Sequence, residues 1–194
     1  MPCDVFYPFK EVPGNQSMPI SGGIIFNDDE IQLIKDTLKD LSWEKGMVET
    51  GGNDSDRISD IKFIPFNDKT MWFYQKIFKV AQGINDINYK FKLHGLVDQL
   101  QYGRYLKDGK YDFHIDIGVG KSGLRKLSCS ILLSDPDDFE GGIFQYTQGP
   151  KISTYYLKKG EILFFPSWIR HRVKPITSGE RLSLVGWFGG THYK

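Results

Sequence analysis

The spacing of apolar residues changes near residue 89, and this change constrains the fold more than any other feature. Before it, Ile31, Ile34, Leu38 and Leu41 lie at positions i, i+3, i+7 and i+10, which is the spacing of one helix face. After it, apolar and polar residues alternate, and clusters of Gly, Pro, Asp and Ser recur about every eight to twelve residues, as between short strands. We therefore expect helices in the first half of the chain and antiparallel strands in the second.

Two amphipathic helices are expected before the change. The first covers 28–41, where Asn27 and Glu30 form the pattern of a capping box. The second starts near Asn67 and ends around 83–86.

The second half contains a series of candidate strands. These are 89–93, 97–105, 113–117, 127–133, 143–147, 154–157, 162–165, 171–175 and 182–188. About eight short antiparallel strands in roughly 100 residues are typical of a jelly roll or of a related sandwich or barrel. The expected fold class is therefore α+β, mainly β, with supporting helices at the N-terminal end.

The length of 194 residues suits one domain with one core. We expect a single domain over 1–194, with an N-terminal arm over 1–23, helical support over 24–88 and the β core over 89–190. Its 25 Lys and Arg against 24 Asp and Glu do not favour a nucleic-acid partner. No stretch reaches the ~20 apolar residues of a membrane span. With two cysteines and no signal-peptide pattern, the expected location is cytoplasmic.

Three residues form a candidate metal site. His114 and Asp116 lie two positions apart in an expected strand, so their side chains point to the same side. His171 leads into another expected strand and is the third candidate ligand. Two imidazoles and one carboxylate are the ligands of non-haem iron(II) oxygenases, but zinc in a hydrolase can use the same atoms.

Arg181 distinguishes the iron oxygenase interpretation from the zinc hydrolase interpretation. It lies ten residues after His171, and strand parity places Ser183 on the same face. If that face is interior, a guanidinium stands deep in the barrel. There it can pair with the distal carboxylate of a five-carbon diacid whose other end chelates the metal. The alternative for Arg181 is a solvated residue after a hairpin turn.

Several further motifs accompany these residues. They are Gln101-Tyr102-Gly103-Arg104-Tyr105 running to Gly109 and Tyr111, Glu140-Gly141-Gly142, Gly160-Glu161 running to Phe165-Pro166, and His171-Arg172-Val173. With them, the chain over about 90–190 resembles the iron(II)/2-oxoglutarate dioxygenases, and within these the prolyl/lysyl-hydroxylase-like (PKHD-type) branch.

The resemblance implies a fold and a set of site residues. The fold is a double-stranded β-helix, in which His114, Asp116 and His171 bind iron and form the catalytic centre. Arg181 binds the distal carboxylate of 2-oxoglutarate, with Ser183 assisting. Tyr105, nine residues before His114, matches a tyrosine that donates its hydroxyl to the same carboxylate. Packing in the barrel is an equal alternative for Tyr105, and some prolyl hydroxylases use lysine where this chain has Arg181.

The implied activity is hydroxylation of an amino-acid side chain, foremost a prolyl residue in a peptide or protein. The cofactor and cosubstrates are Fe(II), 2-oxoglutarate and dioxygen, with ascorbate as reductant; neither nucleic acid nor a membrane is an expected partner. Three alternatives stay open: a hydroxylase of a free amino acid or small metabolite, a cupin-like metal protein without 2-oxoglutarate chemistry, and an AlkB-type nucleic-acid demethylase. The last group has a second arginine six residues after the first, where this chain has Trp187.

Two expectations concern the surroundings of the metal. The glycine-rich segment 118–126 follows Asp116 directly, and we expect a lid there, with a positive rim of Lys121, Arg125 and Lys126 for an acidic substrate. A plain hairpin loop is the alternative. The residues considered for an apolar shell, or equally for core packing, are Phe113, Phe164, Phe165 and Trp168.

Overall fold

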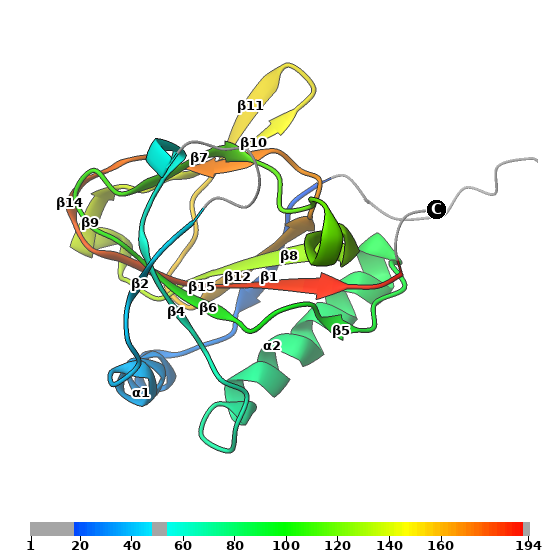
Figure 1. Cartoon of the computed structure of the whole chain (residues 1–194), viewed down its shortest axis with the longest axis horizontal. Coiled ribbons are helices and arrows are strands. Elements are labelled where there is room, and N and C mark those ends of the chain that lie inside the picture. Colours follow the sequence, from blue (N-terminus) through cyan, green and yellow to red (C-terminus); the bar gives the residue numbers. More distant parts are fainter. Residues whose placement is uncertain (1–17, 48–53, 192–194) are drawn as a thin grey trace, which may run out of the picture.

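Two antiparallel β-sheets lie face to face, and two α-helices cover the outer face of the larger sheet (Figure 1). The computed structural model describes residues 18–47 and 54–191, and all structural statements below refer to them. The expectation of a mainly β fold with helices near the N-terminal end is confirmed.

The larger sheet has eight strands in the described part of the chain. Their order is β1 (Ile20–Ile24), β12 (Glu161–Pro166), β8 (Arg125–Leu132), β15 (Arg181–Gly189), β6 (Gln101–Tyr105), β4 (Asp60–Phe63) and β2 (Glu44–Lys45), with β5 (Gly95–Leu96) pairing with β15. Strands that lie far apart in the sequence are thus direct neighbours.

The smaller sheet has five strands in the order β11 (Lys151–Tyr155), β10 (Phe144–Gln148), β13 (His171–Val173), β7 (Lys110–His114) and β3 (Arg57–Ile58). A separate pair joins β14 (Ile176–Gly179) to β9 (Phe139–Gly141). Short 3-10 turns are η1 (Asp54–Asp56), η3 (Gly120–Leu124) and η4 (Pro136–Asp138).

The helices are α1 (Asp28–Leu38) and α2 (Met71–Ile84). The capping box at the start of α1 is confirmed, because Asn27 Oδ1 accepts from the Glu30 N–H at 2.9 Å and Glu30 Oε2 accepts from the Asn27 N–H at 3.0 Å. No helix among the described residues is long and apolar enough to cross a membrane.

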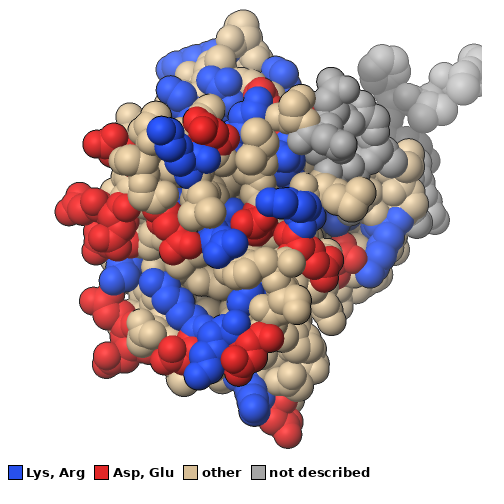
Figure 2. Space-filling view, turned by 60° about the vertical axis from the view of Figure 1, so that its left-hand side comes forward, with Lys and Arg blue, Asp and Glu red and all other residues tan. Residues whose placement is uncertain are grey.

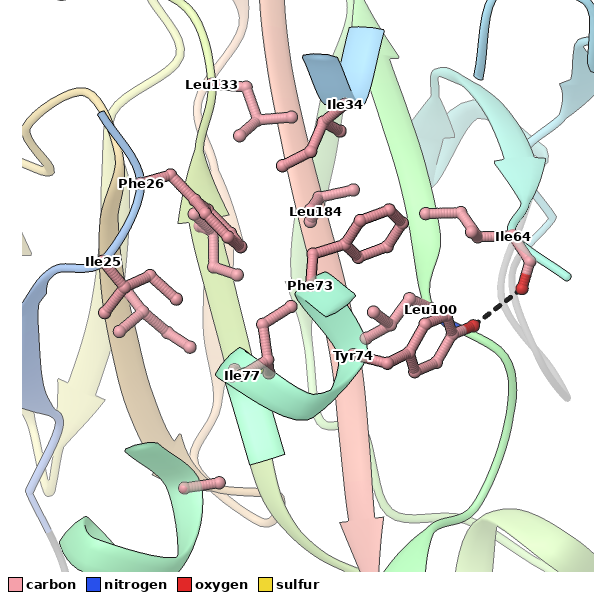
Figure 3. Packing of buried hydrophobic residues seen from close by; sticks show 14 of the residues in the cluster. Ile25, Phe26, Ile34, Ile64, Phe73, Tyr74, Ile77, Leu100, Leu133 and Leu184 are labelled. Atoms are coloured by element: carbon pink, nitrogen blue, oxygen red, sulfur yellow. Dashed lines mark hydrogen bonds between the residues drawn. The ribbon is translucent and has the colours of Figure 1, made fainter. Parts of the chain in front are cut away.

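Alternation along β15 divides the buried residues into two layers. Leu182, Leu184 and Phe188 face the helices and pack with side chains such as Phe73 and Ile77 of α2 (Figure 3). The intervening residues of β15 face the smaller sheet. A second apolar cluster fills part of the space between the sheets and consists of Leu132, Phe144, Tyr146, Leu157, Leu163, Phe165 and Ile169.

The predicted strand 89–93 is wrong. A π-helical turn, η2 (Asn85–Tyr89), closes α2 instead. The Asn85 side chain accepts from the Phe91 N–H at 3.0 Å and donates to the Phe91 carbonyl at 2.9 Å. The Asn85 side chain therefore forms the backbone hydrogen bonds that a neighbouring strand would otherwise form. The alternating apolar residues of this segment pack against the core.

The first half of the chain contributes more than helices. The stretch 24–88 also supplies β2, β3 and β4, and β4 pairs with β6 inside the larger sheet. Part of the expected arm over 1–23 is the edge strand β1, which pairs with β12. The remainder, 1–17, lies outside the described residues.

Lys62 is a buried charged residue that stabilises the end of α1. Its ammonium donates to the carbonyls of Leu38 at 2.8 Å and Lys39 at 3.0 Å, and it lies 4.5 Å from the centre of the Trp43 ring. We expect Lys62→Met to lower the free energy of unfolding by about 1–3 kcal/mol, because helix-terminal carbonyls lose their donor. Urea unfolding measures this, with the exposed Lys69→Met as control. Equal losses in both variants would contradict the role.

Candidate active site

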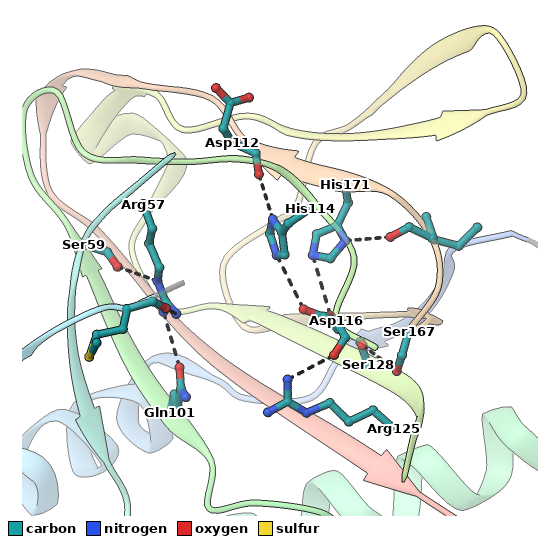
Figure 4. A network of polar contacts seen from close by, with 12 residues as sticks. Arg57, Ser59, Gln101, Asp112, His114, Asp116, Arg125, Ser128, Ser167 and His171 are labelled. Atoms are coloured by element: carbon teal, nitrogen blue, oxygen red, sulfur yellow. Dashed lines mark hydrogen bonds and ion pairs between the residues drawn. The ribbon is translucent and has the colours of Figure 1, made fainter. Parts of the chain in front are cut away.

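Three side chains converge at the end of the smaller sheet where β7 ends and β13 begins (Figure 4). The candidate ligand atoms of His114, Asp116 and His171 all lie within 4.8 Å of one another. His114 Nε2 lies 3.5 Å from Asp116 Oδ1, and His171 Nε2 lies 3.7 Å from Asp116 Oδ2. The structure therefore brings together the three residues that the sequence singles out, in an arrangement able to hold one metal ion.

The two histidines are held in the tautomer that a metal requires. His114 Nδ1 lies 2.8 Å from the carbonyl of Asp112, and His171 Nδ1 lies 2.9 Å from the carbonyl of Ile169. A carbonyl oxygen only accepts hydrogen bonds, so each Nδ1 carries a proton, and in the neutral form of the ring each Nε2 has a free lone pair. Both lone pairs belong to the nitrogens nearest Asp116.

Asp116 is not in the strand in which the sequence places it. β7 ends at His114, and the Asp116 N–H donates to the carbonyl of Ser167 at 2.9 Å. Ile115 is exposed while the Asp116 side chain is buried, so the two ligands still face the same side. The parity argument gives the right face, but a loop contact rather than a strand pair holds the carboxylate.

Burial and the interactions with neighbouring groups shift the pKa values of His171 and Asp116. Burial lowers the pKa of His171 to about 4, which keeps its ring neutral near pH 7. Burial would by itself raise the pKa of Asp116, but His171, His114 and a hydrogen bond from Ser128 outweigh it and hold that pKa well below its usual range. A neutral imidazole beside an ionised carboxylate suits a divalent cation.

A β-bulge brings Tyr111 to the same site. Three residues of β13, from His171 to Val173, are matched by four residues of β7, from His114 to Tyr111. The ring of Tyr111 stacks on that of His114, with centres 3.4 Å apart and an angle of 11°. The guanidinium of Arg57, on β3, lies 4.7 Å from the centre of the Tyr111 ring. Tyr111 belongs to one of the sequence motifs but was given no site role, because strand parity places i and i+3 on opposite faces. Arg57 is not among the residues singled out from the sequence, and it reaches the site only because β3 pairs with β7.

Arg181, Ser183 and Tyr105 meet on the inner face of the larger sheet, as expected. Arg181 pairs with Tyr105 across β15 and β6, and its Nη1 donates to Ser183 Oγ at 3.2 Å. Only 2% of Arg181 is exposed, and within the described chain it forms no ion pair. Burial lowers the pKa of this guanidinium, which remains charged at pH 7. The solvated-hairpin alternative for Arg181 is wrong.

Gly142 leaves room for Arg181. Its φ is +58°, and a Cβ there would lie 2.8 Å from Arg181 Cδ and 2.5 Å from Ile176 Cδ1. A side chain at Gly142 would be strained and would displace the arginine stem. The second glycine of the Glu140-Gly141-Gly142 motif therefore provides the space that the Arg181 side chain occupies.

A cavity of about 250 Å³ opens at the three candidate ligands. Tyr105, Tyr111, Arg57 and Arg125 are among the residues that line it, with Val185 and Trp187 of β15. Arg181 lines a second cavity of about 150 Å³ instead, and Phe144 borders both. The Tyr105 ring, 5.6 Å from the Arg181 guanidinium, connects the arginine to the first cavity.

The surroundings of the cavity differ from expectation in two respects. Of the aromatic residues considered for a shell, Phe165 lines the cavity and Phe164 packs against the helices. Trp168 contacts Phe91 at 5.4 Å between ring centres, and Phe113 lies on the outer face of the smaller sheet beside two arginines.

The expected lid also differs. Arg125 and Lys126 are buried in β8 and do not form a positive rim. Arg125 donates to the Asp116 carbonyl at 3.1 Å and to Asp98 at 2.9 Å, and Lys121 of η3 pairs with the same Asp98 at 2.6 Å. Arg125 thus ties the segment to Asp116, and Asp98 links Arg125 to Lys121.

Comparisons with known proteins agree with this geometry. Residues 100–189 match the 2OG-Fe(II) oxygenase superfamily. A PKHD-type hydroxylase of Prochlorococcus marinus (strain MIT 9215) is 31% identical over 172 residues, covering 84% of this chain and 74% of the relative. One from strain AS9601 is 30% identical over 162 residues, covering 82% and 73%.

Solved structures show the same fold. A prolyl-4-hydroxylase from Pseudomonas putida has a TM-score of 0.70 at 18% identity, covering 89% of this chain and 92% of that one. A prolyl hydroxylase from Trichoplax adhaerens, in complex with a hypoxia inducible factor peptide fragment, has a TM-score of 0.72 at 15% identity, covering 90% and 84%.

Fold, site and sequence matches together define an oxygenase that uses Fe(II), 2-oxoglutarate and dioxygen. Within that superfamily the chain belongs to the PKHD-type hydroxylases. The alternative of a cupin-like protein without 2-oxoglutarate chemistry does not fit this membership.

Proposed function

We propose that this enzyme hydroxylates prolyl residues within polypeptides, with an iron(II) held by His114, Asp116 and His171. The observation that carries the metal assignment is the convergence of the Nε2 atoms of His114 and His171 on the buried carboxylate of Asp116. His114, Asp116 and His171 would hold the ion, and it would remain accessible from the cavity to 2-oxoglutarate and dioxygen. Bound iron supplies the activation of dioxygen, coupled to oxidation of 2-oxoglutarate to succinate and CO₂.

Arg181 binds the distal carboxylate of 2-oxoglutarate in this proposal, with Ser183 and Tyr105 assisting. A fully buried guanidinium without an acidic partner is costly, and a ligand carboxylate offsets that cost. Tyr105 borders both the first cavity and the guanidinium, so a diacid can lie along it.

We also propose that the two facing sheets form a double-stranded β-helix of the jelly-roll type, and that residues 1–194 belong to one domain. The core over 89–190 carries all the proposed ligands of iron and 2-oxoglutarate, and the helices of 24–88 support the larger sheet. The proposed reductant is ascorbate, and the proposed location is the cytoplasm. The net charge of +1 favours neither nucleic acid nor a membrane as partner.

The choice of a peptidyl substrate rests on two supports. The cavity is bordered by exposed apolar residues such as Phe63 and Ile115, which suit an extended chain lying across its mouth. The structural neighbours include prolyl hydroxylases, one of them bound to a peptide fragment.

A peptide-library screen tests the substrate. The protein is incubated with Fe(II), ascorbate, 2-oxoglutarate and proline-containing peptides, and mass spectrometry should find products heavier by one oxygen atom. Omission of 2-oxoglutarate is the control. Turnover of free amino acids alone would move the assignment to the small-metabolite alternative.

A further inference from the structure

The outer face of the smaller sheet carries a cluster of cations around an aromatic ring, which we call the outer patch: Lys110, Phe113, Arg170 and Arg172. The guanidinium groups of Arg170 and Arg172 lie 4.5 Å and 4.4 Å from the centre of the Phe113 ring. Arg172 Nε also donates to Gln145 Oε1 of β10 at 2.9 Å. The ring and the amide restrict both arginines, so less side-chain entropy is lost when a ligand binds.

The acidic side chains near the outer patch neutralise only part of its positive charge. Asp112 is shared between Lys110 at 3.8 Å and Arg172 at 4.0 Å, both long contacts. Arg170 is exposed and forms no ion pair within the described residues. Figure 2 shows several Lys and Arg with few acidic residues among them at the top of the molecule, where the smaller sheet lies, whereas basic and acidic residues mix lower down. The guanidinium groups are therefore available for carboxylates.

The position of the outer patch ties it to the active site. Phe113 directly precedes His114, and Arg170 and Arg172 flank His171. The patch and the two candidate ligands thus lie on opposite faces of the same two strands, β7 and β13. The faces meet at the end of the sheet, where exposed Ile115 borders the cavity. A chain leaving the cavity over Ile115 arrives at the outer patch.

We propose that the outer patch binds an acidic segment of the polypeptide substrate, flanking the residue that is oxidised. This inference rests on the proposed peptidyl substrate and adds a preference for Asp or Glu. An extended peptide rises about 3.3 Å per residue, so an acidic side chain about three to five residues from the target reaches the arginines. The helices α1 and α2 cover the opposite side of the molecule, so neither helix covers this face of the smaller sheet (Figure 1).

The test compares matched peptides on two enzymes. One peptide carries Glu residues about three to five positions from its proline, and its partner carries Gln at the same positions. On the wild-type enzyme we expect KM for the Glu peptide to be about five- to tenfold lower, with kcat equal, as exposed ion pairs of up to about 1 kcal/mol each imply. Arg170→Gln/Arg172→Gln should remove this preference and leave KM for 2-oxoglutarate unchanged. Added salt should weaken the preference, because the groups are exposed.

Controls distinguish binding at the outer patch from a general effect of positive charge, and a failure of this inference from a failure of the proposed function. Lys39→Gln/Lys79→Gln removes two exposed lysines from the helical side and should keep the preference. Equal KM values for both peptides on the wild-type enzyme would overturn the patch while leaving the hydroxylase proposal intact. Fluorescence anisotropy of a labelled Glu peptide, with Mn(II) and 2-oxoglutarate present, tests binding without turnover. Equal binding by the wild type and the arginine double variant would overturn the patch even if no peptide is hydroxylated.

Discussion

Replacing His171 with alanine is expected to reduce 2-oxoglutarate turnover by at least about a hundredfold, because the proposed iron loses one of its three protein ligands. Loss of even an outer partner of a metal ligand typically costs about 10–100-fold in affinity or activity, so loss of a ligand costs more. Succinate release measures turnover, and titration with Mn(II) measures metal binding independently of it. Both quantities should fall together.

The matched control for this variant is His94→Ala. His94 is exposed and is not among the clustered metal-binding candidates of the described chain. Its replacement should leave Mn(II) affinity and turnover at wild-type levels. A His171→Ala protein that keeps full 2-oxoglutarate turnover would show that the triad is assigned incorrectly.

Replacing Arg181 with methionine is expected to raise KM for 2-oxoglutarate more than tenfold. Truncating one partner of a buried charge pair costs about 2–5 kcal/mol, and about 1.4 kcal/mol corresponds to tenfold. Methionine is unbranched and apolar, and no acidic group among the described residues is left unpaired, so the fold should tolerate it. Mn(II) affinity without 2-oxoglutarate should stay unchanged, which separates this variant from His171→Ala.

Arg104→Gln is the control for Arg181. Arg104 lies on β6 next to Tyr105 but points to the other face, where it pairs with Asp60 at 2.9 Å and covers Trp43. Its loss should affect stability and not KM for 2-oxoglutarate. If Arg181→Met leaves this KM at the wild-type value, the cosubstrate assignment of Arg181 does not hold.

The interior position of Arg181 shows what a local sequence pattern can predict and what it cannot. Parity along one strand groups Arg181 with Ser183, and the structure places both on the inner face. The opposite layer of the same strand, including Leu184 and Phe188, packs on the helices. Because side chains alternate strictly in a regular strand, the pattern determines which residues share a face. Whether that face is interior depends on the second sheet.

The sequence by itself determined the features that depend on neighbouring residues. These are the mainly β second half, the capping box of α1, and the shared side of His114 and Asp116. The period of apolar residues and the capping box follow from backbone geometry over a few positions. For His114 and Asp116 the local pattern gave the right side, although a distant contact with Ser167 holds Asp116 there.

Only the tertiary structure decided the features that need a partner from elsewhere in the chain. The bulge that stacks Tyr111 on His114 depends on the register between β7 and β13, and Arg57 reaches that stack because β3 pairs with β7. The segment 89–93 alternates like a strand but lacks a strand partner, because Asn85 bonds its backbone. Hydrogen bonds between distant segments are chosen by competition among all possible partners, and one-dimensional periodicity does not contain the outcome of that competition.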